Sequence, residues 1–401
     1  MEPKIRFKGF EGGWKDTIWG NHIVYTHTGT NLLGEVSNKG IPLLKMGNIQ
    51  RGFFDLDKME YLAANQNPPV NCIANYGDFF YNTRNTLELV GKGATWMKID
   101  GIYAFNSNIA ICKLDGIDTF FFNYLYNTLR SIKQVQARAK GTTSVAAVYM
   151  RDLKSIELAL PHISEQQAIA SYFTTLDSQI SASTSRLASL KQMKAASLQA
   201  MFPQEGETVP KIRFKGFEGE WKKVKADSIF KTFNEKNRPD LPVLSATQDR
   251  GMVTRESIGY NIFHDTSNEA TYKHILPGQF VIHLRSFQGG FAHSEIEGIA
   301  SPAYTIIDFK NKDLYHDYYW RYVFMSKEFI KRLELITYGI RDGRSISYDE
   351  FKEMSFLVPS KEEQIKIASY LKNLDRQISL QSQRLEKLKQ IKSACLDKMF
   401  V

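Results

Sequence analysis

The chain contains an internal repeat built from two segments that each occur twice. Residues 3–14 read PKIRFKGFEGGW, and residues 210–221 read PKIRFKGFEGEW. Further along each half, EQQAIASYFTTLDSQI at 165–180 matches EEQIKIASYLKNLDRQI at 362–378. The sequence between the repeated segments differs in length and in most side chains. This pattern predicts two halves of one architecture. Because their interiors differ, we expect them to recognise different ligands.

The second repeated segment has the spacing of a long amphipathic helix. In both copies apolar residues recur in steps of four and three, which is typical of a coiled-coil seam. The predicted seam residues are Ile169, Phe173, Leu176, Ile180, Leu187 and Leu190 in the first helix and Ile367, Leu371, Leu374, Ile378, Leu385 and Leu388 in the second. We expect the two helices to form an antiparallel coiled coil, because isolated seams would expose apolar stripes to water. The alternative is that each helix packs on its own domain.

Proline and capping signals predict where the long helices begin. A serine follows a proline in each half and has Gln or Glu three residues later, which is a capping-box pattern at Ser164 and at Ser360. These signals divide the chain into a first domain (1–160), a first helix (161–202), a linker (203–209), a second domain (210–358) and a second helix (359–401).

Both variable segments have the composition of mixed α/β structure. Strand-like runs at Asp78–Asn82 and Gln279–Leu284 each follow a glycine, and aromatic-rich helices are expected near Asp118–Ala137 and Asp313–Leu335. The same order of elements recurs in both halves. The predicted fold class is therefore two α/β (α+β) domains, related by an internal pseudo-twofold repeat and separated by two long helices.

Composition narrows the functional classes. The net charge of +9 favours a polyanionic partner such as nucleic acid. The three cysteines have no CxxC spacing, which argues against a disulfide framework or a zinc site and fits a reducing cytoplasm. Neither a signal peptide nor a run of roughly 18 apolar residues is present, so we expect a cytoplasmic protein without a membrane span.

With these features the chain resembles the specificity subunits of type I restriction–modification systems. The resemblance covers essentially the whole chain, and its most specific parts are the PKIRFKGFEG box, the EEQxxIAxYLxxLDxxI helix starts and the GTTS loop at 141–144. It implies two target-recognition domains that each read half of a split DNA site. It also implies two modification (methyltransferase) subunits and restriction (translocase-nuclease) subunits as partners, which would use S-adenosylmethionine, ATP and Mg. The second half departs from the pattern, with GIRDGRS at 339–345 in place of GTTS, so the two loops need not contact DNA alike.

Signals for catalysis in the chain itself are weak. NPPV at 67–70 resembles the Asn-Pro-Pro-aromatic motif of adenine methyltransferases, but Val70 replaces the aromatic residue that would stack on a flipped base. A proline turn in a loop explains NPPV better. The sequence has no phosphate-binding GxxxxGK[ST] loop and no HExxH. We therefore expect no catalytic residue, no metal site and no cofactor in this chain.

Candidate DNA contacts lie after matched strands and in two later loops. Arginine can bind guanine through two hydrogen bonds, and asparagine or glutamine can do the same for adenine. The candidates after the strands are Arg84 and Asn85 in the first half and Arg285, Ser286 and Gln288 in the second. Those in the loops are Lys140, Thr142, Thr143, Ser144, Arg341 and Arg344. Pairing of the arginines inside their own domain, and ordinary turn chemistry in the loops, are the competing explanations.

The sequence thus predicts a non-catalytic subunit in which two domains read two half-sites at a separation fixed by the coiled coil. That subunit would direct adenine methylation and restriction by its partners. The alternative is a free-standing DNA-binding or scaffold protein that needs no modification partner. The number of reading domains distinguishes these two hypotheses. A dimerising regulator usually carries one reading domain per chain and binds a palindrome, whereas this chain contains two unlike domains.

Overall fold

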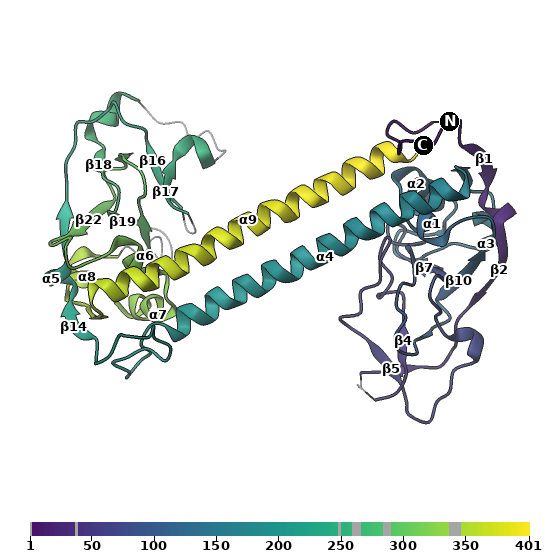
Figure 1. The fold of residues 1–401 in the computed structure, drawn as a ribbon, viewed down its shortest axis with the longest axis horizontal. Coiled ribbons are helices and arrows are strands. Elements are labelled where there is room, and N and C mark those ends of the chain that lie inside the picture. The colour runs from purple at the N-terminus through teal and green to yellow at the C-terminus, as the bar shows by residue number, and fades with distance from the viewer. Residues whose placement is uncertain (1, 37–38, 248–249, 259–265, 284–289, 337–345) are drawn as a thin grey trace. The chain divides into compact units, whose positions relative to one another are not determined.

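The computed structural model describes residues 2–36, 39–247, 250–258, 266–283, 290–336 and 346–401. The chain divides into two compact units. Unit 1 consists of Met1–Thr184 and Arg384–Val401, and unit 2 consists of Ser185–Gln383. Each unit therefore contains one domain and parts of both long helices, which Figure 1 labels α4 and α9.

The long helices α4 (Ile163–Ala200) and α9 (Lys361–Met399) pair in opposite directions within each unit. In unit 1, Tyr172 Oη on α4 lies 3.4 Å from Cys395 Sγ on α9. In unit 2, Ser197 Oγ on α4 lies 3.3 Å from Tyr370 Oη on α9. Partners later in α4 are thus earlier in α9, which confirms the predicted antiparallel pairing.

Unit 1 is built around an antiparallel sheet in the order β2-β10-β6-β8, with smaller sheets β3-β5-β4-β9, β11-β12-β7 and β1-β13. Helix α1 supplies aromatic side chains, and α2 supplies Val135, to the core that joins this sheet to the beginning of α4 and the end of α9. The elements are β1 (Lys15–Ile18), β2 (Ile23–Thr28), β3 (Gly34–Glu35), β4 (Pro42–Leu44), β5 (Glu60–Leu62), β6 (Phe79–Asn82), β7 (Arg84–Asn85), β8 (Gly93–Thr95), β9 (Ala104–Phe105), β10 (Ile109–Leu114), α1 (Thr119–Tyr126), α2 (Leu129–Ala137), β11 (Lys140–Gly141), β12 (Ala146–Ala147), α3 (Met150–Leu153) and β13 (Glu157–Leu160).

Unit 2 repeats this plan. Its main sheet has the order β15-β22-β19-β20, which matches β2-β10-β6-β8 element by element. The elements are β14 (Lys222–Lys225), α5 (Ala226–Ile229), β15 (Phe230–Phe233), β16 (Leu244–Thr247), β17 (Gly251–Thr254), β18 (Lys273–Ile275), β19 (Phe280–Ile282), β20 (Phe291–His293), β21 (Gly298–Ala300), β22 (Thr305–Phe309), α6 (Asp317–Met325), α7 (Lys327–Ile336), α8 (Tyr348–Glu353) and β23 (Ser355–Val358). The predicted fold class, two mixed domains with two long helices, is confirmed.

The repeated PKIRFKGFEG box fastens the long helices to each other. In unit 1, the Arg6 guanidinium makes two hydrogen bonds to the Glu165 carboxylate at the start of α4, at 2.8 Å and 2.7 Å. The neighbouring Ile5 N–H donates to the Lys398 carbonyl near the end of α9. Because one short segment binds the beginning of one helix and the end of the other, the box has a structural role.

The box of unit 2 makes the equivalent contacts. Arg213 binds Glu363 at 2.7 Å and 2.8 Å, at the start of α9. The neighbouring Ile212 N–H donates to the Ala200 carbonyl at the end of α4. The duplication of the box in the sequence therefore corresponds to a duplicated junction of helix ends.

One of the two predicted helix caps is wrong. At α9, Ser360 precedes the helix and its Oγ accepts from Glu363 N at 3.4 Å, as predicted. At α4, however, the helix begins at Ile163, so Ser164 lies inside its first turn. The equivalent position is occupied by His162, whose carbonyl accepts from Glu165 N at 2.9 Å. The two helices therefore start at matching residues, and the offset between the predicted caps disappears.

Candidate nucleic-acid interface

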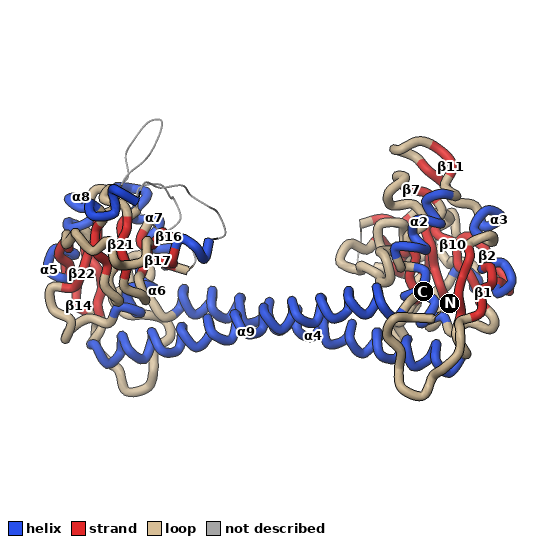
Figure 2. The backbone as a smooth tube through the Cα atoms, turned by 90° about the horizontal axis from the view of Figure 1, so that it is seen from above, coloured by secondary structure: helices blue, strands red, loops and turns tan. Residues whose placement is uncertain are grey.

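A small sheet in unit 1 brings the two groups of predicted contact residues together. Strand β12 pairs with β11 on one side and with β7 on the other, so that Ala147 faces both Lys140 and Arg84. The hairpin formed by β11 and β12 has the GTTS loop at its tip. Figure 2 shows this hairpin on the side of unit 1 away from the long helices. Residues that are far apart in the sequence thus form one surface.

Arg84 is the least constrained of the predicted residues in this sheet. Its side chain is exposed, and within the described part of the chain it has no ion pair and no side-chain hydrogen bond. The backbone of β7 holds its position through the pairing with Ala147. Asn85 beside it is half-buried, and its Oδ1 accepts from Thr86 N at 2.8 Å. A fixed backbone with a free guanidinium is suited to an acceptor supplied by another molecule.

The hairpin tip is a turn whose hydroxyl groups face solvent. Thr142 N donates to the Val145 carbonyl at 2.9 Å, and Thr142 Oγ1 lies 3.2 Å from Ser144 Oγ. The Thr143 carbonyl accepts from Leu87 N, which ties the tip to the loop after β7. The turn needs glycine at Gly141, where φ is +133° and a Cβ would lie 2.3 Å from the Val145 carbonyl oxygen. The loop is therefore held by the hydrogen bonds of an ordinary turn, and its side chains are still exposed to solvent.

Lys140 differs from Arg84 because it already has a partner in its own domain. Its Nζ lies 3.0 Å from Asp152 Oδ2 in α3. The hydrogen bond from Lys140 lowers the pKa of Asp152 and is the largest cause of that shift. The lysine is 55% exposed, so it can also face an anion, but its first role is to hold the hairpin against α3.

A groove of about 530 Å³ lies beside Arg84 and contains polar residues that the sequence did not single out. Its walls come from β2, β6, β10 and the segment after β12. They include His27, Thr28, Asn31, Asn108 and Tyr149. The Tyr149 ring is 45% exposed, and the guanidinium of Arg151 lies 5.2 Å from its centre. No sequence signal pointed to this groove, because the fold alone brings β2 next to Arg84.

In unit 2 the predicted contacts Arg285, Ser286, Gln288, Arg341 and Arg344 lie outside the described residues. The described residues that flank them are close together. His283 N donates to the Gly290 carbonyl at 3.0 Å, which joins the residues on either side of 284–289. A Cβ on Gly290 would lie 2.1 Å from Ile346 Cδ1, so the residue after 337–345 packs against the residue after 284–289. The flanks of the two segments therefore meet, as β7 and β12 do in unit 1.

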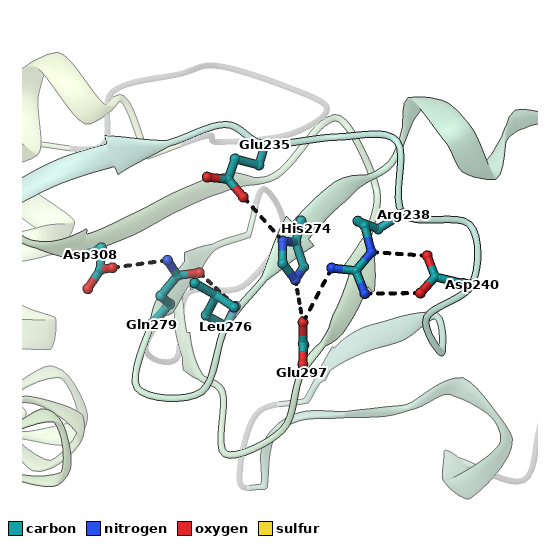
Figure 3. A network of polar contacts seen from close by, with 8 residues as sticks. All are labelled: Glu235, Arg238, Asp240, His274, Leu276, Gln279, Glu297 and Asp308. Carbon is teal, nitrogen blue, oxygen red and sulfur yellow. Dashed lines mark hydrogen bonds and ion pairs between the residues drawn. The ribbon is translucent and has the colours of Figure 1, made fainter.

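Unit 2 also contains a polar network around His274, which Figure 3 shows. The His274 side chain is 6% exposed, with Nε2 2.8 Å from Glu297 Oε1 and Nδ1 3.4 Å from Glu235 Oε2. Arg238 makes a two-point ion pair with Asp240, at 3.0 Å for both contacts. Every one of these side chains has a partner within the unit. The network therefore ties His274 of β18 to Glu235 before it and to Glu297 after it.

Three further features of the described residues concern the NPPV segment, metal binding and membrane crossing. In the NPPV segment Val70 is 89% exposed at the start of a short 3₁₀ turn, Val70–Cys72, in keeping with a surface loop. Within the described ranges, no cluster of three or more His, Cys, Asp or Glu could hold a metal ion. Among the helices of those same ranges, none combines the length and the apolar character needed to cross a membrane.

The predicted seam residues lie inward along both long helices. Ile169, Phe173, Leu176, Leu190, Ile367, Leu371, Leu374 and Leu385 are buried, and Ile180, Leu187, Ile378 and Leu388 are half-buried. Some of these seam residues also pack in the hydrophobic cores of the domains. Phe173 packs in the unit 1 core and Leu371 in the unit 2 core. The seam therefore both pairs the helices and anchors each domain.

Comparisons with known proteins agree with this architecture. The family model for the type I restriction modification DNA specificity domain matches residues 32–192 and 218–390. A crystal structure of the S subunit of a type I restriction–modification system from M. genitalium is 15% identical, with a TM-score of 0.64, and the match covers 100% of this chain and 99% of that one. At this identity the likeness shows a shared fold.

Two further solved structures match with lower scores. One comes from work on complex assembly and conformational transition of the type I R-M system, with 16% identity, a TM-score of 0.49 and coverage of 98% and 99%. The other is the HsdS subunit from Thermoanaerobacter tengcongensis, with 16% identity, a TM-score of 0.45 and coverage of 98% and 97%. No match was found among curated protein sequences.

Proposed function

Because the chain belongs to the type I restriction–modification DNA specificity family, we propose that it is the DNA-reading subunit of such a system. Each domain reads one half of a bipartite site, and the helix pair keeps the two half-sites at a constant gap. The single observation that carries this proposal is the sheet that joins the free guanidinium of Arg84 to the exposed GTTS hairpin. The net charge of +9 supports a polyanionic ligand.

In this proposal the chemistry belongs to partner subunits in the cytoplasm. Two modification subunits methylate adenine with S-adenosylmethionine, and restriction subunits use ATP and Mg. Apolar side chains on the long helices, such as Met193, Leu380 and Ile391, are 49%, 55% and 37% exposed and support docking of modification subunits by added helices. The chain itself contributes recognition and geometry.

The proposed constant gap can be tested by lengthening both long helices. Four residues inserted after Thr184 and four after Gln383 fall at the positions in each helix where one unit ends along the chain and the other begins. Each insertion adds about 6 Å of helix, or roughly two base pairs of duplex. We expect methylated sites with unchanged half-sites and a longer gap. An unchanged gap in an assembled, active complex would remove the idea that the helices set the distance.

A further inference from the structure

A group of three polar side chains joins the first domain to both long helices. Tyr124 Oη on α1 donates to Asp177 Oδ2 on α4 at 2.9 Å. The other oxygen, Asp177 Oδ1, lies 2.5 Å from Lys392 Nζ on α9. The same lysine Nζ is 5.8 Å from the centre of the Tyr124 ring. This group, called triad 1, therefore links three elements through a single carboxylate.

The second domain has the same group with the helices exchanged. Tyr322 Oη on α6 donates to Asp375 Oδ2 on α9 at 2.7 Å, and Asp375 Oδ1 lies 2.6 Å from Lys194 Nζ on α4. The lysine Nζ is 5.9 Å from the Tyr322 ring centre. In this group, triad 2, the aspartate comes from α9 and the lysine from α4. Each long helix thus supplies the aspartate of one triad and the lysine of the other.

The triads add a directional preference that the apolar contacts around them lack. Burial of aromatic surface, as between Tyr124 and Phe173, is strong but has little directional preference. Hydrogen bonds and ion pairs weaken steeply when their geometry changes. Tyr124 is 4% exposed and Tyr322 is fully buried. Burial is the main cause that raises the pKa of both hydroxyl groups, so both remain hydrogen-bond donors at neutral pH.

The aspartates explain a part of the repeated sequence that the seam does not. The LD pair of both helix segments has its leucine in the seam and its aspartate beside it, at Asp177 and Asp375. These carboxylates are 36% and 31% exposed, at the boundary between domain and helix pair. An aspartate at this position is unfavourable for seam packing but is suited to a tyrosine on one side and a lysine on the other.

We propose that triads 1 and 2 are positioning groups that fix the orientation of each domain on the helix pair and so set how strictly the gap between half-sites is read. This inference rests on the proposed function and adds six residues to it. These residues act through the geometry of the domains and do not touch DNA. Their loss should leave the preferred bases unchanged and should widen the range of accepted gaps.

The test uses the full chain co-expressed with its modification subunits. After the wild-type site has been mapped, duplexes are prepared with both half-sites and with gaps one and two base pairs shorter or longer. For Tyr124→Phe and for Tyr322→Phe, we expect the ratio of methylation rates between the optimal gap and its neighbours to fall by about tenfold, because a hydrogen bond to a charged acceptor is worth about that factor. The rate at altered half-site bases should not change.

Tyr172→Phe is the matched control, because its hydroxyl group links α4 only to α9. It should keep the wild-type gap ratio. Lys392→Gln is a second variant for triad 1, since the lysine is 29% exposed and its replacement disturbs folding least. An unchanged ratio in both triad 1 variants, or an equal loss in Tyr172→Phe, would overturn the inference. A wild-type complex without any gap preference would instead refute the proposed function.

Discussion

Arg6 and Glu165 make two parallel hydrogen bonds, from Nε to Oε1 at 2.8 Å and from Nη2 to Oε2 at 2.7 Å. The Glu165 side chain is 2% exposed, so Arg6 is the partner that offsets the cost of burying its carboxylate. Arg213 and Glu363 repeat the pair in unit 2, where Glu363 is 1% exposed. The most recognisable repeat of the sequence thus encodes a two-point ion pair between an N-terminal box and a helix start.

Removal of the arginine should destabilise the unit that contains it. Arg6→Ala leaves a buried carboxylate without a cation, and we expect the melting temperature of unit 1 to fall by about 5 °C. Differential scanning calorimetry of the full chain measures this change. Arg213→Ala should do the same for unit 2, and Lys8→Ala, an exposed residue of the same box, should have little effect. Equal melting curves for Arg6→Ala and Lys8→Ala would contradict the structural role of the box.

Arg84→Ala should weaken DNA binding without affecting the fold. Because Arg84 is exposed and has no partner among the described residues, its removal leaves no buried group unpaired. We expect the affinity of the assembled complex for its mapped site to fall by about tenfold. Fluorescence anisotropy with a labelled duplex measures the affinity, and thermal melting checks the fold. Lys133→Ala removes a charge from the exposed side of α2 and serves as the control. If the two variants bind DNA equally well, Arg84 is not a contact.

Gly141→Ala should disrupt the hairpin and spare the rest of unit 1. The new Cβ would lie 2.3 Å from the Val145 carbonyl oxygen in a backbone with φ of +133°. The residues of the loop are exposed, so the core should be unaffected. We expect loss of recognition at one half-site only, read as methylation of duplexes altered in one half-site at a time. Gly9→Ala, with φ of +96° and no atom within 4 Å, has strain without collision and is the comparison. Intact recognition in Gly141→Ala would exclude the hairpin from the interface.

Unit 2 should lose stability in mildly acidic solution. Burial is the main cause that lowers the pKa of His316 below its usual 6.5. Between the lowered folded pKa and 6.5 the unfolded chain binds more protons than the folded one, so stability falls as the pH drops below 6.5. Asp317 also has a lowered pKa, but it titrates below 3.8. Urea denaturation at pH 7.5 and pH 5.5 should show a smaller pH effect in His316→Gln than in the wild type. An equal pH effect in both proteins would show that groups other than His316 cause the loss of stability.

The repeat and the helical spacing were sufficient to predict the fold class, and the reasons are local. Gly77 and Gly278 both have positive φ, at +84° and +88°, and precede β6 and β19 as their alignment indicated. The seam spacing likewise follows from helix geometry alone. The cap at Ser164 failed because a histidine carbonyl took the role that the serine side chain has in the other helix.

The candidate site was only partly predictable. Arg84 and the GTTS loop were recognised separately, but only the pairing of β7 with β12 brings them together. The groove residues from β2 and the partner of Lys140 depend on tertiary packing, which leaves no periodic signal in the sequence. The triads were missed for the same reason, because Tyr124 reads as a core aromatic until its hydroxyl group is seen on Asp177.

Mapping N6-methyladenine in cells tests most directly whether this chain decides which DNA sites are methylated. Genomic DNA would be sequenced for this modification from cells with the intact chain, without it, and with Arg84→Ala. We predict a bipartite motif of two unlike half-sites with one constant gap, present only with the intact chain and weakened by Arg84→Ala. A methylation pattern that persists unchanged when the chain is removed would contradict the account.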